Sequence, residues 1–243
     1  MMKLFNSLTN NVRFTYLSGK NTINIPIDYS AEKIKSNQKL SYAKTLIFNI
    51  PAYALSYDEG KATWQNQFLG TILKGNVDMS KIQIEGTHKS YFITDCNDLV
   101  SVKNFYSSQG PESLFYHCPK LKYFHCLKAD RSIADFLNNC PELEEVIIES
   151  ADVSTDYSSN FTLSNSPKLK KLIWKGLHHS NNTGSLSINL SGCTLLTEEA
   201  LVEFFNSLGT NKYAATITLG STLLSKLTDE DKAIATNKGW TLA

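Results

Sequence analysis

A short phrase that recurs four times constrains this 243-residue chain more than any other feature. Each copy begins with Cys or Ser, places Leu three residues later, and places another apolar residue three residues after that Leu. The copies begin at Cys96, Cys118, Cys140 and Ser166, which are 22, 22 and 26 positions apart. A repeat of this length predicts a stack of small units, each of which buries its apolar side only against its neighbours.

Within each copy, apolar residues alternate with polar ones after the Leu, as in a strand with one buried face. The side chains expected to point inward form the sets Leu99/Val102/Asn104, Leu121/Phe124/Cys126, Leu143/Val146/Ile148 and Leu169/Leu172/Trp174, and Met79/Ile82/Ile84 extends the series toward the N-terminus. Further strands are expected at 45–50, 187–191 and 216–219. The spacing predicts an α/β leucine-rich-repeat solenoid with a parallel β-sheet face and short irregular helices on its outer side.

Two segments carry apolar residues at helical spacing, 132–139 and 197–208. Thr197 precedes two glutamates, so it is expected to cap the second helix at its N-terminus, where the helix dipole favours negative charge. Both helices are therefore predicted to be short connectors of the stack.

The two ends of the chain carry signals for caps. Residues 13–27 alternate around a Ser-Gly-Lys-Asn turn, which predicts a β-hairpin over the open end of the stack. Near the C-terminus, Thr228 and Asp231 form a capping box, and Gly239 is expected to end that helix before Trp240. A helical cap should therefore close the other end.

These signals divide the chain into two parts. Residues 1–44 form an N-terminal hairpin, serving as a cap or an attachment segment, and residues 45–243 form the repeat body, with a closing cap over about 192–243. Segments 150–165 and 178–184 are rich in Ser, Asn and Thr, and are expected to be surface loops.

The charge and composition of the chain argue against several classes of partner and location. The net charge is +1, which gives no electrostatic attraction to nucleic acid. No apolar run approaches the length of a membrane span, and residues 1–11 lack the apolar stretch of an export signal, so neither membrane insertion nor export is expected. Most of the five cysteines follow the repeat, which favours reduced, buried thiols over a disulfide between stacked copies.

The sequence gives little indication of a metal site or a catalytic site. His117-Cys118 and His125-Cys126 contain zinc-ligand residue types, but the alternation directs Cys126 inward and His125 outward, so the four are not expected to converge. The pair 178–179 is expected to be solvated. No catalytic motif occurs, so neither enzymatic activity nor a cofactor or metal is expected.

The same alternation identifies an outward face on three successive strands. Its residues are Tyr123, His125, Leu127, Glu145, Ile147, Glu149, Lys171, Ile173 and Lys175. Glu145 should lie beside Lys171 and Glu149 beside Lys175, so that opposite charges pair across the strands. Between them an apolar strip with a charged rim has the character of a protein-binding patch. The alternative is that a loop or a second copy of the chain covers this strip.

Several stretches resemble leucine-rich-repeat proteins. The Cys-x-x-Leu phrase resembles short repeats in proteins of gut and oral bacteria, and 191–201 resembles the cysteine-containing repeats of eukaryotic F-box adaptors. Residues 215–243, with Leu-Thr-Asp-Glu-Asp and Gly-Trp-Thr-Leu, resemble a C-terminal cap of such proteins in gut bacteria and their phages, often tail-associated. The usual Asn ladder after the strand is replaced here by Ser107, Ala129, Ala151 and Leu177.

The resemblance implies a non-enzymatic interaction scaffold. The expected role is that of a phage virion protein, tail-associated, which binds other virion proteins or a host surface receptor through its repeat face and loops. Such a protein would be made in the host cytoplasm and located in the virion. The alternatives are a bacterial surface adhesin and an intracellular adaptor.

Overall fold

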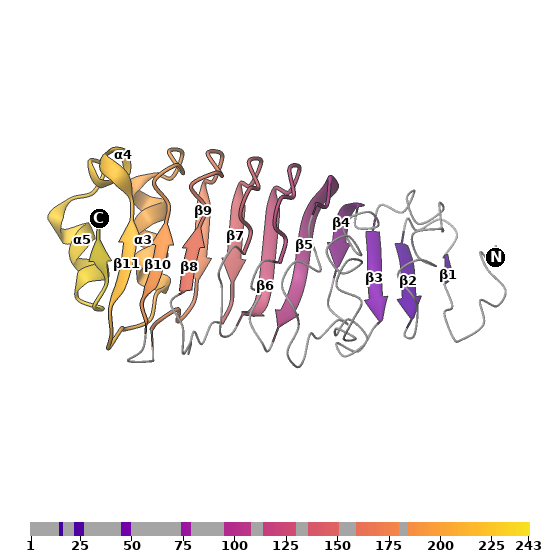
Figure 1. Ribbon diagram of the computed structural model, residues 1–243, viewed down its shortest axis with the longest axis horizontal. Coiled ribbons are helices and arrows are strands. Elements are labelled where there is room, and N and C mark those ends of the chain that lie inside the picture. Colours follow the sequence, from indigo (N-terminus) through magenta and orange to yellow (C-terminus); the bar gives the residue numbers. More distant parts are fainter. Residues whose placement is uncertain are drawn as a thin grey trace.

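Two parallel sheets joined by turns and a few short helices make up this α/β protein (Figure 1). The computed structural model describes residues 15–16, 22–26, 45–49, 74–78, 95–107, 114–129, 136–150, 159–179 and 184–243. The larger, eight-stranded sheet contains, in order, β1 (Thr15–Tyr16), β2 (Thr22–Pro26), β3 (Thr45–Asn49), β4 (Lys74–Asp78), β5 (Asp98–Ser107), β6 (Tyr123–Ala129), β7 (Glu145–Ile148) and β9 (Lys171–Trp174). The smaller contains β12 (Thr241–Leu242), β11 (Ala215–Thr218), β10 (Leu186–Asn189) and β8 (Ser159–Thr162).

The N-terminal strands follow the expected order. β1 pairs antiparallel with β2, with Tyr16 opposite Ile23, as in the expected hairpin, and β3 lies within the expected strand 45–50. Every other pairing in the two sheets is parallel. The predicted set Met79/Ile82/Ile84 falls outside the described residues, and β4 lies just before it in the chain.

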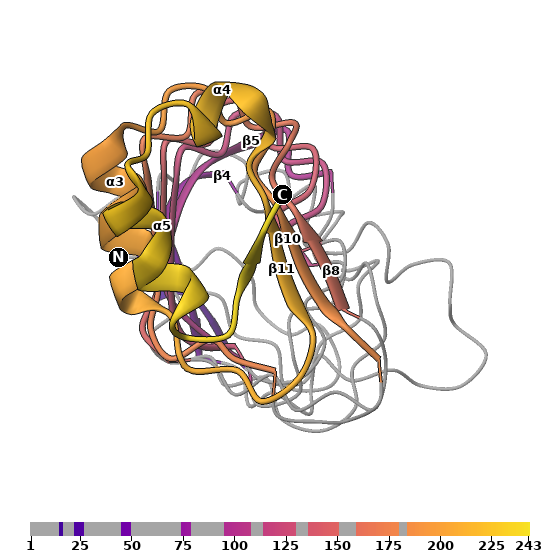
Figure 2. The ribbon, with the colours of Figure 1, turned by 90° about the vertical axis from the view of Figure 1, so that its left-hand side faces the viewer.

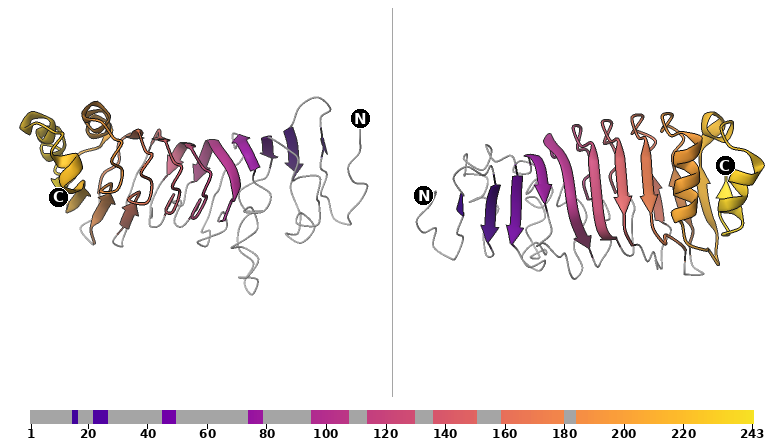
Figure 3. Two further views of the ribbon diagram at one scale, coloured as in Figure 1. Left: turned by 90° about the horizontal axis from the view of Figure 1, so that it is seen from above. Right: turned by 180° about the vertical axis from the view of Figure 1, so that it is seen from behind.

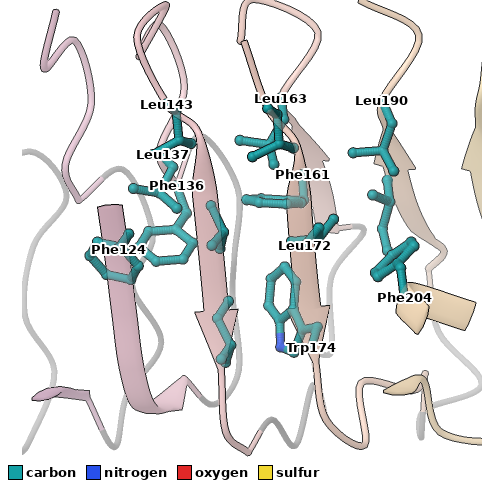
Figure 4. Packing of buried hydrophobic residues seen from close by; sticks show 14 of the residues in the cluster. Phe124, Phe136, Leu137, Leu143, Phe161, Leu163, Leu172, Trp174, Leu190 and Phe204 are labelled. Carbon is teal, nitrogen blue, oxygen red and sulfur yellow. The ribbon is translucent and has the colours of Figure 1, made fainter. Parts of the chain in front are cut away.

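Equivalent side chains of successive strands stack in the core. Phe124, Val146 and Leu172 share one register position on β6, β7 and β9, and all three are buried. Aromatic rings link these layers. Phe124, Phe136, Phe161 and Trp174 follow one another with centroid separations of 5.1, 6.0 and 4.8 Å (Figure 4). Such pairs each contribute about 0.5–1.5 kcal/mol beyond their buried area.

One predicted inward residue, Asn104, does not enter the core. The register between β5 and β6 shifts after Val102, and Phe105 takes the position opposite Cys126. Asn104 instead adopts a left-handed backbone with φ 59°, and its side-chain amide donates to the Asp78 carboxylate at 3.0 Å. A β-bulge inserts one residue, so the side-chain alternation shifts by one and the larger apolar residue is buried.

The smaller sheet replaces much of an expected surface loop. Within segment 150–165, β8 places Phe161 in the core beside Ile188 of β10, which in turn lies beside Ile217 of β11. The prediction of a loop there was wrong over 159–162, because a strand with one apolar residue among polar ones carries little alternation. The expected strands 187–191 and 216–219 are confirmed as β10 and β11, one residue earlier at their starts.

The helices predicted at 197–208 and after Thr228 form, but they continue the sheet and do not cover its outer side. α3 (Glu198–Ser207) packs beside β9, and α5 (Asp229–Thr236) packs beside α3, so the two helices continue the row of the eight-stranded sheet (Figures 2 and 3). The Gly176 N–H, just after β9, donates to the Ser207 carbonyl at 2.8 Å. In the predicted helix 132–139, the described residues 136–139 form turns instead.

The C-terminal helices have the predicted caps. The Thr197 hydroxyl accepts from the Ala200 N–H, and Thr228 and Asp231 form a reciprocal capping box. α4 (Gly220–Leu224) precedes α5. Gly239 follows α5 with φ 79°, and the buried Trp240 indole donates to the Gly209 carbonyl at 3.1 Å. The end of the chain therefore packs onto the preceding turn.

One lysine joins the last two helices. The Lys238 ammonium donates to the carbonyls of Phe205, Asn206 and Leu208, at 2.9, 2.8 and 2.8 Å. These carbonyls lie at the C-terminal end of α3, which carries partial negative charge, and the Phe205 carbonyl also accepts from the Leu208 N–H. Lys238 therefore caps α3 from the segment that follows α5.

Candidate binding face

The predicted outward residues do lie together on three neighbouring strands of the eight-stranded sheet and on the turns that follow them. The backbone register aligns Tyr123, Glu145 and Lys171 in one row and His125, Ile147 and Ile173 in the next. We call these two rows, together with Leu127, Glu149 and Lys175, the outer face. Tyr123 and Leu127 are 44% and 41% exposed, which makes them its most accessible large apolar side chains.

Ile173 differs from the prediction. It is only 7% exposed, whereas its register neighbours His125 and Ile147 are half-buried. Ile173 lies on β9, the strand against which α3 packs. A helix is about 10 Å wide, much thicker than a strand, so its side chains extend over both surfaces of the sheet edge. The accessible apolar part of the outer face therefore ends at β7 and does not include Ile173, whereas Lys175 after β9 stays exposed.

Charged side chains of the outer face pair in the turns that follow the strands, but not within the row that contains Glu145 and Lys171. Glu149 forms a close ion pair with Lys175, as predicted, and its second oxygen lies 3.5 Å from His125 Nε2. The lysine ammonium, with a smaller contribution from His125, lowers the pKa of Glu149. These contacts connect β6 with the turns after β7 and β9.

The predicted pair between Glu145 and Lys171 does not form. The two residues are register neighbours, yet no ion pair joins them. The adjacent Glu144 instead lies 3.0 Å from Lys170 and 3.5 Å from Lys122, and these lysines lower its pKa. The charge ladder therefore forms at the residues before the strands, and Glu145 keeps its carboxylate on the outer face.

The turns before the strands carry a second ladder of equivalent residues. Cross-unit contacts join Asp95 with His117 at 2.6 Å, Asp98 with Lys120 at 2.7 Å, Glu142 with Lys168 at 2.6 Å, and Asn139 with Asn165 at 2.8 Å. Exposed pairs of this kind are each worth well under about 1 kcal/mol, so they align neighbouring units rather than hold them together.

The repeated cysteines lie buried and unbridged at the same turns, which confirms their predicted packing role. Their thiols also donate hydrogen bonds. Cys140 donates to the Phe115 carbonyl at 3.3 Å, Cys193 donates to the Leu163 carbonyl at 3.1 Å, and Ser166, which takes the place of a cysteine, donates to the Cys140 carbonyl at 3.0 Å. These donors satisfy turn carbonyls in the absence of the usual Asn ladder.

Burial controls the chemistry of three of these thiols, whereas hydrogen bonds from Cys140 and Cys96 lower the pKa of Cys118. Burial raises the pKa of Cys193 to about 12 and raises the pKa values of Cys96 and Cys140. A thiol with a raised pKa and no solvent access is a poor nucleophile and a poor metal ligand. Across the part of the chain that the structure describes, no three His, Cys, Asp or Glu side chains are placed to hold a metal ion.

The histidine pair 178–179 is not solvated as predicted. His179 is fully buried, its ring lies edge-on to Tyr213, and its backbone N–H donates to the Asn211 side-chain oxygen at 2.6 Å. The half-buried His178 ring contacts the Gly176 carbonyl at 2.8 Å. A buried imidazole packs as a flat, mostly apolar ring, so a polar sequence context alone did not indicate its burial.

A polar hollow adjoins the outer face on its N-terminal side. It has a volume of about 580 Å³, and Tyr123 and Glu145 line it together with Asn76, Asp78, Ser101 and Lys103 of β4 and β5. The sequence did not indicate these last four residues, because the bulge in β5 disturbs the alternation and β4 precedes the strand that the repeat predicted.

No known protein family, curated protein or solved structure matches this chain. Among the helices within the described ranges, none has both the length and the apolar character needed to cross a membrane.

Proposed function

We propose that this chain is a leucine-rich-repeat solenoid that acts as a non-enzymatic interaction scaffold and binds a protein partner through its outer face. The recurrent 22- to 26-residue unit and the parallel order of successive strands support the solenoid assignment. One observation carries the binding role. Tyr123 and Leu127 stay exposed beside half-buried His125 and Ile147, within a rim of charged side chains.

An apolar centre with a charged rim is the composition of a protein-binding patch. The cross-strand contacts of Glu149 with Lys175 and His125 hold the rim in place before any partner arrives. Pre-ordered side chains lose less conformational entropy on binding, so they favour affinity. The outer face is thus suited to a folded protein surface of complementary shape.

The proposed setting is a phage virion, with the chain in or near the tail, where the outer face contacts another virion protein or a host surface receptor. The resemblance of residues 215–243 to caps in gut bacteria and their phages supports this setting. Mass spectrometry of purified particles should detect the chain at a fixed ratio to the major tail proteins. Its absence from particles that infect normally would overturn the virion proposal.

A pair of matched variants tests the binding role of the outer face. Leu127→Arg places a charge in the apolar centre, whereas Thr216→Arg places the same charge on the outward side of β11 in the smaller sheet. We expect Leu127→Arg to weaken particle assembly or host adsorption at least about tenfold, the loss typical of a central interface residue, and Thr216→Arg to leave both unchanged. Equal effects of the two variants, or none from Leu127→Arg, would contradict the proposal.

A further inference from the structure

The polar hollow between β4 and β7 has features of a ligand site that the protein-binding strip does not need. It opens on the outer side of the eight-stranded sheet, next to the exposed ring of Tyr123. Its walls come from four successive strands, which lie side by side (Figure 1). Rigid strands hold side chains in fixed positions more accurately than loops do, which favours selective binding.

Irregular backbone surrounds the hollow. The register between β4 and β5 shifts at Gly75/Asn76, where Gly75 has φ 64°, and the register between β5 and β6 shifts again after Val102. Asn104 occupies the second irregularity with φ 59°. Bulges commonly occur where a strand turns a side chain toward a site, and two of them in adjacent strand pairs break the flatness of the sheet here.

The hollow is lined by both hydrogen-bond donors and hydrogen-bond acceptors. The Ser101 hydroxyl, only 4% exposed, donates to the Asn76 side-chain oxygen at 2.6 Å, which fixes the Asn76 amide, and its NH₂ has no partner among the described residues. The Asn104 amide likewise fixes the Asp78 carboxylate. Within the described ranges, the side chains of Lys103, Tyr123 and Glu145 have no hydrogen-bond or ion-pair partner. The lining of the hollow thus carries donors on Asn76, Lys103 and Tyr123 and acceptors on Glu145 and Asp78.

From this arrangement we infer that the hollow binds a neutral saccharide, with a sugar ring placed against Tyr123. Each sugar hydroxyl both donates and accepts, which matches a wall of mixed donors and acceptors. The C–H face of a pyranose packs on an aromatic ring, as the exposed Tyr123 side chain allows. One lysine beside two carboxylates leaves the hollow without the excess positive charge that a phosphate or sulfate would require.

This inference goes beyond the proposed protein contact. The proposed protein contact is centred on Leu127 and Ile147 of the outer face, whereas the hollow is lined by side chains of β4 and β5 that lie outside the outer face. Tyr123 and Glu145 belong to both regions, so a saccharide carried on a protein surface could contact the hollow while that protein covers the strip. Loss of one contact need not remove the other.

The test uses the full chain on an array of immobilised neutral, anionic and amino oligosaccharides. Isothermal titration then measures the free form of the neutral oligosaccharide that binds best. We expect Tyr123→Ala to weaken that binding at least about tenfold, and Glu145→Gln to weaken it several-fold, as removal of a central anchor and of one acceptor would. The matched control is Tyr213→Ala, which removes an aromatic ring that is 38% exposed outside the hollow.

Three results would overturn the inference. They are an unchanged chain that binds no neutral oligosaccharide on the array, binding by Tyr123→Ala that equals that of the unchanged chain, and equal losses of affinity in Tyr123→Ala and Tyr213→Ala. Circular dichroism melts verify that each variant folds. Leu127→Arg separates the two proposals, since it should abolish the protein contact while oligosaccharide binding persists. Absence of the chain from virions would leave the saccharide result unaffected.

Discussion

Replacement of Gly192 by alanine tests how closely successive units stack. Gly192 lies in the turn after β10, and its backbone does not adopt the left-handed conformation. Alanine should therefore suit the local backbone, and by restricting the unfolded chain it should stabilise the protein by about 0.4–1 kcal/mol if nothing else intervened. However, a Cβ at this position would lie 1.8 Å from the Ser164 carbonyl oxygen of the preceding unit.

To bring the Cβ and the carbonyl oxygen to an ordinary van der Waals distance, the two turns must separate by roughly more than 1 Å. The neighbouring bonds oppose the separation. The Cys193 thiol donates to the Leu163 carbonyl at 3.1 Å, and the Leu163 N–H donates to the Asn189 carbonyl at 2.9 Å. Overpacking of this tight site, together with one or two strained hydrogen bonds, should lower the free energy of unfolding by about 3 kcal/mol or more.

Urea denaturation monitored by circular dichroism measures the free energy of unfolding of Gly192→Ala. Thr194→Ala, an exposed substitution two residues along the same turn, serves as the control and should change stability by less than about 0.5 kcal/mol. A loss of 3 kcal/mol also corresponds to a melting temperature lower by about 6–12 °C. A neutral or stabilising effect of Gly192→Ala would refute the close stacking of these turns.

Three further predictions follow from contacts in the C-terminal half and on the outer face. Lys238→Met removes three charge-assisted hydrogen bonds to the end of α3, so chemical denaturation should show a loss of stability of about 2–3 kcal/mol, against little change for Lys232→Met, whose ammonium contacts only the exposed Asp229 carboxylate. Cys193 should react with a thiol reagent only after denaturation, because burial raises its pKa to about 12, and rapid labelling of the native protein would contradict this. Lysines lower the pKa values of Glu144 and Glu149. The two ionised glutamates therefore stabilise the folded protein fully above the ordinary glutamate pKa, and this stabilisation disappears as pH falls through the lowered values. Unfolding measured from pH 7 to 3 should therefore show an acid-induced loss that Glu149→Gln reduces.

The repeat predicted four strands of the large sheet, β5, β6, β7 and β9, because inward positions recur at a nearly constant spacing and buried apolar residues are easy to recognise there. Leu99, Leu121, Leu143 and Leu169 are all buried at the same point of successive units. Capping residues were equally predictable, since a hydroxyl or carboxylate before a helix satisfies backbone N–H groups by short-range geometry alone.

The sequence was less informative where long-range contacts decide the outcome. Burial of Phe105 in place of Asn104 depends on a bulge, and burial of Phe161 depends on a second sheet that its polar neighbours conceal. Ile173 and His179 are buried by packing partners distant in the chain, which strand periodicity cannot reveal. The hollow beside Tyr123 arises from the same bulge, so it too was outside the reach of sequence patterns.

The most direct test of the outer face is site-specific photocrosslinking. A benzoylphenylalanine is placed at Ile147, in the centre of the outer face, or at Thr216 on the smaller sheet, and particles are assembled from each chain and irradiated alone and with host cells. We predict a single protein adduct from position 147, lost when Leu127→Arg is also present, and no adduct from position 216. Adducts from position 216 and none from position 147 would contradict the account.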